Sequence, residues 1–161
     1  MQIIHLALVR TSSPGDAVVL SQCSDLAQFG FFERPTVRQM LQFFAKTVCG
    51  RVSPGQRVSV DQEEMEGYRV HAHVRADGLA ATATCDTEYP ARAAFSLLAQ
   101  ALAEFERASP GWRAGVLYST IPYCTVLHST VQYCPVLYST VQWPIHTNSA
   151  VSYTHLRAHE T

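Results

Sequence analysis

The charged residues of this 161-residue chain stop abruptly about two-thirds of the way along it. Of the twelve Lys and Arg residues and the thirteen Asp and Glu residues, only Arg113, Arg157 and Glu160 lie beyond position 110. The two parts differ too much in composition to form one folded unit. We therefore expect one globular domain over residues 1–110, with a tail of another kind after it.

The overall composition suits a globular protein, because 47% of the residues are hydrophobic and the formal net charge is -1. There is no basic excess of the kind that binds nucleic acid. There is also no apolar run of about 18 residues that would cross a bilayer. The N-terminus lacks the basic and small-residue pattern of a signal peptide, so we expect a cytoplasmic protein.

The first half of the domain reads as two strands and a helix. Residues 1–10 carry apolar side chains on both alternating faces, which predicts a central strand covered on both sides. A turn over residues 12–16 leads to a second strand over residues 17–20. A helix beginning near Pro35 and ending at Gly50 has an apolar stripe at helical spacing, formed by Val37, Met40, Leu41, Phe44 and Val48.

The second half predicts three strands and another helix. The strands cover residues 57–60, 68–75 and 79–85, with Asp77-Gly78 as a hairpin turn between the last two. The helix begins near Pro90, and its apolar stripe consists of Ala91, Ala94, Phe95, Leu98, Leu102 and Phe105. This order of elements favours an α+β fold, in which an antiparallel sheet has helices on its faces.

Aromatic residues cluster just before each predicted helix. Phe29, Phe31 and Phe32 precede the first helix, and we expect them to dock their loop onto the core. Tyr89 precedes the second helix, whose buried stripe includes Phe95. All five are therefore predicted core residues.

Phe43 lies apart from the apolar stripe of the first helix, about 100° around the helix axis from Phe44. Its neighbours on that side are polar. Two interpretations remain open. Phe43 is either a single exposed aromatic residue at the core margin or one wall of a groove for an apolar partner.

Three strings in the domain are distinctive: FGFFER with VRQM over residues 29–40, VHAHVRADGLA over residues 70–80, and DTEYPARAAFSLL over residues 86–98. They resemble the loop and first helix, the central hairpin and the start of the second helix of the prenylated, lipid-anchored longin SNAREs, the Ykt-type R-SNARE family. The resemblance extends through about residue 107.

This resemblance implies a longin (profilin-like) fold, a five-stranded antiparallel sheet sandwiched by helices, with no catalysis and no cofactor. In this family the domain is a cytosolic switch of vesicle trafficking. An apolar groove beside its first helix receives the protein's own SNARE segment or its lipid anchor. The released segment joins other SNARE helices at Golgi, endosomal and vacuolar membranes. Carried onto this chain, the groove would include Met40, Phe43 and Phe44, which favours the groove interpretation of Phe43.

A full family member continues into a heptad-patterned SNARE segment and ends in a prenylation box. Neither pattern follows here, and the chain ends at His159-Glu160-Thr161. We therefore expect this chain to lack the parts that enter a SNARE bundle and hold a lipid. The alternative is a longin-fold subunit of a coat adaptor or tethering complex, because such subunits have no SNARE segment.

The tail has two unusual parts. Within residues 111–150, a ten-residue unit beginning at Val116 occurs three times, as VLYSTIPYCT, VLHSTVQYCP and VLYSTVQWPI. Such near-identical copies are more typical of translated repetitive DNA than of a solenoid. Residues 151–161 resemble a translated sequencing adaptor. We expect the tail to be disordered or non-native.

No catalytic or metal site is predicted, because the chain has no nucleophile elbow, phosphate-binding loop, dinucleotide fingerprint or H-E-x-x-H. His71 and His73 share a strand face, but no third ligand is evident, so we interpret them as partly exposed sheet residues. His155 and His159 have the spacing of zinc ligands on a helix, but they fall in the adaptor-like segment.

Overall fold

The computed structural model describes residues 2–114. The elements follow the predicted order: β1 (Ile3–Ser13), β2 (Asp16–Ser24), α1 (Arg34–Arg51), β3 (Arg57–Asp61), β4 (Tyr68–Val74), β5 (Leu79–Asp86), α2 (Ala91–Ala108) and a short 3-10 helix, η1 (Trp112–Ala114). The predicted repeats from Val116 onward and the adaptor-like segment over residues 151–161 lie outside the described residues.

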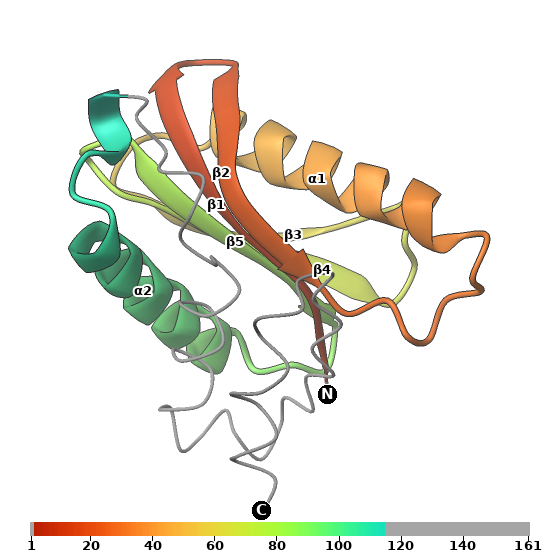
Figure 1. Ribbon diagram of the computed structural model, residues 1–161. Coiled ribbons are helices and arrows are strands. Elements are labelled where there is room, and N and C mark those ends of the chain that lie inside the picture. Colours follow the sequence, from red (N-terminus) through yellow and green to blue (C-terminus); the bar gives the residue numbers. More distant parts are fainter. Residues whose placement is uncertain (1, 115–161) are drawn as a thin grey trace, which may run out of the picture.

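The five strands form one antiparallel sheet in the order β2-β1-β5-β4-β3. Helix α1 covers one face of this sheet and α2 covers the other (Figure 1). As predicted, β1 lies inside the sheet between β2 and β5, and its residues from Ile3 to Val9 are all buried. The expected α+β sandwich of the longin type is confirmed.

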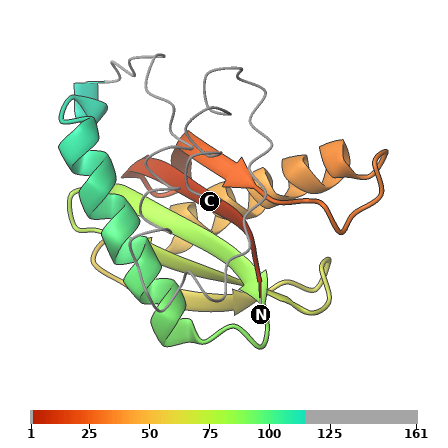
Figure 2. The ribbon, with the colours of Figure 1, turned by 60° about the horizontal axis from the view of Figure 1, so that its bottom comes forward.

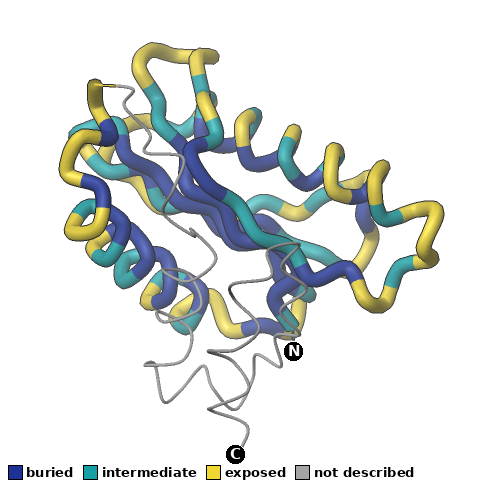
Figure 3. Tube along the Cα trace, in the orientation of Figure 1, coloured by how far each residue is buried: buried dark blue, intermediate teal, exposed yellow. Residues whose placement is uncertain are grey.

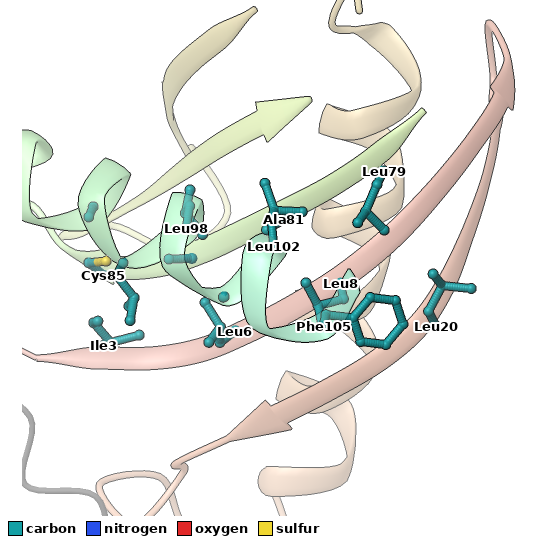
Figure 4. Close-up of a cluster of buried hydrophobic side chains, with 14 of the residues drawn as sticks. Ile3, Leu6, Leu8, Leu20, Leu79, Ala81, Cys85, Leu98, Leu102 and Phe105 are labelled. Carbon is teal, nitrogen blue, oxygen red and sulfur yellow. The ribbon is translucent and has the colours of Figure 1, made fainter. Parts of the chain in front are cut away.

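Alternating residues of β1 supply both halves of the core. Leu6 and Leu8 point to the α2 side and pack with Leu98, Leu102 and Phe105 (Figure 4). Ala7 and Val9 point to the α1 side, where they share a cluster with Ala45 and Cys49. Each helix therefore needs only one apolar stripe, because the sheet supplies the facing surface.

The covering of both sheet faces corrects the interpretation of His71. This residue is fully buried, although the strand pattern predicted partial exposure. The reason is α2: the ring of Phe95 lies 5.5 Å from the His71 ring, and the Ser59 hydroxyl is 2.8 Å from its Nδ1. His73, two residues further along β4, is partly exposed as predicted.

Gly50 does not end α1, which continues through Arg51 to an extended residue at Val52. Gly50 instead permits a close contact with the β1–β2 turn. The Gly15 N–H donates to the Gly50 carbonyl at 3.1 Å, and a Cβ on Gly50 would lie 3.4 Å from the Gly15 Cα. A Cβ at position 50 would therefore lie in van der Waals contact with this turn.

The packed domain extends past the expected boundary at residue 110. Helix α2 ends at Ala108, as the Ser109-Pro110-Gly111 sequence suggests, and η1 follows it (Figure 2). Trp112 is 2% exposed and joins the same core cluster as Phe105. A tryptophan buries a large apolar area, so the residues that hold it belong to the folded unit.

We predict that Leu98→Ala destabilises the domain by roughly 2–5 kcal/mol, because Leu98 is fully buried between α2 and the sheet. Urea unfolding measures this loss. Ser96→Ala is the matched control, because Ser96 lies on the exposed side of α2 and its replacement should change stability by less than about 0.5 kcal/mol. Equal stabilities for the two variants would contradict the described position of α2.

Candidate functional site

The entry into α1 is held by hydrogen bonds from two charged side chains. Pro35 occupies the first turn of α1. A backbone N–H at this position would have no acceptor within the helix, so the helix loses no hydrogen bond to proline. The Glu33 carboxylate accepts from the Gly30 N–H at 3.1 Å. The Arg34 guanidinium donates to the carbonyls of Phe29 at 3.1 Å and Ala27 at 3.3 Å. These bonds determine where the β2–α1 loop lies.

Apolar residues of α1 and of the edge strand β3 pack against one hydrophobic cluster on the α1 side of the sheet. Phe44 is buried in the core cluster on the α1 side of the sheet, and Met40, one turn before it, is half-buried against that cluster. Val58 and Val60 of β3 are also half-buried there. We call the group formed by Met40, Phe43, Phe44, Val58 and Val60 the α1–β3 margin.

Phe43 is the exposed member of this margin, with 63% of its surface accessible. Its ring is tilted against Phe44, with the two centroids 6.2 Å apart. The predicted position on the flank of the helix is therefore confirmed, and the fold brings all three predicted groove residues, Met40, Phe43 and Phe44, onto one side of α1. Phe43 is thus a large exposed aromatic residue beside partly buried apolar residues.

The aromatic cluster before α1 only partly docks onto the core. Phe29 packs against the α1-side core, and its ring lies 6.3 Å from that of Tyr68. The prediction is wrong for Phe31 and Phe32, which are 74% and 90% exposed. They lie in the turn that projects beyond the sheet, where no other element covers them (Figure 3).

Tyr89 and Phe95 belong to the opposite side of the sheet. Tyr89 is 3% exposed and packs in the core as predicted, whereas Phe95 is only half-buried against the α2-side core. The Arg57 guanidinium lies 6.0 Å from the Phe95 ring centroid. Because the sheet separates these residues from α1, they support the fold and do not line the α1–β3 margin.

Burial favours the neutral form of three histidines in the sheet. Burial lowers the pKa of His5 to about 4, although its hydrogen bond to the Gln22 side chain acts in the opposite direction. Burial also lowers the pKa values of His71 and His73. Within residues 2–114, no group of three or more His, Cys, Asp or Glu side chains could hold a metal ion. The residues gathered at the margin are apolar and can bind a partner by burying surface.

Sequence reasoning did not find the contribution of β3 to the margin. The alternation of Val58 and Val60 was visible within the predicted strand over residues 57–60. Only the sheet order shows that this strand is at the edge, and only the packing shows that both valines face the side covered by α1.

An antiparallel sheet with a helix on each face defines an α+β sandwich domain. The longin family, described as a regulated-SNARE-like domain, matches residues 26–121. This match covers more than half of the chain, and the chain therefore belongs to the longin family.

Named relatives place the chain near the Ykt-type R-SNAREs. It is 39% identical over 125 residues to the VAMP-like protein YKT61 of Arabidopsis thaliana, covering 76% of this chain and 61% of the relative. It is 41% identical over 105 residues to the synaptobrevin homolog YKT6 of Yarrowia lipolytica, covering 65% and 50%. For the synaptobrevin homolog YKT6 of Saccharomyces cerevisiae, identity is 39% over 110 residues, covering 68% and 53%. The chain thus spans about half to three-fifths of these relatives.

We predict that acid weakens the domain partly through His5. Its native pKa of about 4 lies below the usual 6.5, so between these pH values the unfolded chain binds a proton that the native state does not. Stability therefore falls as the pH falls through this window, by up to roughly 3 kcal/mol from this residue.

Urea unfolding of the wild type and of His5→Leu across this pH range isolates the effect. His71, His73 and the carboxylates titrate in both proteins, so only the difference between them reports His5. The same pH dependence in both proteins would show that His5 is not held neutral.

Proposed function

We propose that this domain is the N-terminal regulatory longin domain of a vesicle-trafficking R-SNARE. The α1–β3 margin is its groove, and the occupant is a SNARE segment or a lipid anchor. In the whole protein, the partners are SNARE helices or the protein's own SNARE segment. The protein is cytoplasmic and lies at the periphery of Golgi, endosomal or vacuolar membranes. Contact with those membranes is made through a lipid anchor.

The observation that carries this proposal is the exposure of Phe43 next to buried Phe44. Half-buried Met40, Val58 and Val60 pack against the same hydrophobic cluster that contains Phe44. A helical segment that presents apolar residues at every third or fourth position would bury this margin. A prenyl chain would also gain free energy in proportion to the apolar surface that it removes from water.

Family membership and the names of the relatives also support the proposal. The matched family is described as regulated-SNARE-like, and two of the relatives are named as synaptobrevin homologs. The family match over residues 26–121 includes α1, β3 and the margin. Since the chain covers only part of each relative, the margin is the feature that a binding experiment should test first.

We predict that Phe43→Glu weakens binding of a synthetic SNARE segment from a Ykt-type relative by about tenfold or more, because a charge is costly to bury in an apolar groove. Isothermal titration calorimetry in the absence of lipid measures the dissociation constant. Phe43 is exposed, so the substitution should leave the urea unfolding midpoint unchanged.

Two control variants separate the site from general effects. Phe43→Leu keeps an apolar side chain and should retain most of the affinity. Val18→Glu places the same charge on an exposed valine of β2, the opposite edge strand of the sheet, and should bind like the wild type. If Phe43→Glu also binds like the wild type, the margin is not the groove.

A further inference from the structure

The two most exposed phenylalanines of the domain lie at a projecting tip. Phe31 and Phe32 are 74% and 90% exposed, and their rings meet edge to face with centroids 5.4 Å apart. The loop that holds them extends beyond the sheet ahead of α1 (Figure 1, Figure 3). Exposing two large aromatic rings side by side forgoes the free energy of their burial, so the pair marks a surface with a partner.

Helix α1, which follows this tip, has an unbalanced charge. It contains Arg34, Arg38, Lys46 and Arg51 and no acidic residue, although the whole chain has a net charge of -1. None of the ion pairs among residues 2–114 includes these four side chains. Arg34 donates only to backbone carbonyls, so its positive charge is not neutralised.

The basic and aromatic groups lie along the outward side of α1. Thr36, Gln39, Phe43 and Lys46 follow one another at intervals of three, four and three residues, which places them on one ridge of the helix. All four are exposed, and Lys46 is the basic member of this ridge; Arg38 is also exposed but lies about 80° around the helix axis from Lys46. The aromatic tip is thus followed along α1 by two exposed basic residues, Arg38 and Lys46.

We infer that this surface, composed of Phe31, Phe32 and the basic outer side of α1, docks onto an anionic lipid bilayer. Phenylalanine rings at a convex tip can enter the interface between headgroups and acyl chains. Arginine and lysine beside them attract the negative surface potential of the membrane. No helix of the described part is long and apolar enough to span a membrane, so the contact is with the bilayer surface.

Charge and shape favour a bilayer over a peptide partner. An acidic helix would complement Arg38 and Lys46, but the loop that holds the two rings projects beyond the sheet and does not form a groove for a side chain (Figure 1). A bilayer accepts a protrusion, because lipids rearrange around the inserted rings. The acidic peptide is therefore kept as an outcome of the test.

Acidic residues restrict how the domain can lie on the membrane. Glu63, Glu64 and Glu66 are exposed on the β3–β4 connection, and Met65 between them packs in the same cluster as Val37 of α1. This connection therefore lies beside α1 on the inner side of the helix, next to the sheet. Repulsion turns it away from anionic lipid, which leaves the tip and the outer ridge as the contacting surface.

The docking surface is distinct from the groove proposed above. Phe43 borders both, so the test changes only Phe31, Phe32, Arg38 and Lys46, none of which belongs to the α1–β3 margin. The inference does not require a bound SNARE segment. The vesicle experiment can therefore refute this inference without refuting the proposed function, and the segment-binding experiment can do the reverse.

The experiment is vesicle cosedimentation of the full 161-residue chain. Vesicles contain phosphatidylcholine alone or with about 30% phosphatidylserine, and partition coefficients are measured at low and high salt. We expect binding to the anionic vesicles that weakens with salt. Phe31→Ser with Phe32→Ser, and separately Arg38→Gln with Lys46→Gln, should each weaken that binding by about tenfold or more.

Matched controls are available elsewhere in the domain. Arg92→Gln with Arg107→Gln removes the same charge from exposed positions on α2, and Val18→Ser removes an exposed apolar side chain from β2. Both should bind vesicles like the wild type apart from a small change due to net charge. Far-UV circular dichroism and urea midpoints verify that every variant is folded.

Equal binding by the wild type and both test variants would overturn the inference. So would equal binding of the wild type to neutral and anionic vesicles, or no binding to either. The inference would also be wrong if an acidic amphipathic peptide binds through Arg38 and Lys46 in solution while vesicles do not. The binding of the SNARE segment to Phe43→Glu is measured without lipid, so its outcome does not affect how the vesicle results are interpreted.

Discussion

Burial of the central sheet between two helices is the constraint on which the rest of the structure depends. Strand β1 is buried from Ile3 to Val9, so alternate residues must pack against α1 on one face of the sheet and against α2 on the other. A register shift between Ile3 and His5, where these residues pair with Cys85 and Thr84, adjusts the alternation at the start of the strand. Because both faces of the sheet are covered, polar side chains of β1 are also buried, and burial keeps His5 neutral at physiological pH.

The same constraint leaves the outer side of α1 available for binding. The inner stripe of this helix is used by the sheet, and the charged residues of the helix are all basic and lie away from it. Strand β3 has a neighbour on one side only, so its valines meet α1 at the border of the core and not in its centre. The margin and the aromatic tip thus follow from one edge of the sheet and from the side of α1 that the sheet does not cover.

Periodicity predicted the helices and strands well, because the spacing of apolar residues within each element reflects the period of that element. The stripe of α2 and the alternation of β4 depend on nearest neighbours in the chain, and Leu98 and Val70 are buried accordingly. His71, Phe31 and Phe32 were placed wrongly, because their burial depends on what lies above them. Helix α2 covers His71 from a segment 20 or more residues away, whereas no element crosses the tip of the β2–α1 loop. Trp112 similarly joins the core through a short turn that no periodic pattern marks.

The sequence by itself determined the α+β class, the order of the elements, the longin resemblance and the position of Phe43 on the flank of its helix. These properties follow from the spacing of residues and from motifs, and both lie within short continuous stretches of the sequence. Tertiary structure alone decided which strand is at the edge, that Val58 and Val60 join Met40 and Phe44 in the margin, and that Phe31 and Phe32 remain in solvent. The physical reason is that a side chain is buried only when a second surface covers it, and that surface comes from a distant part of the chain.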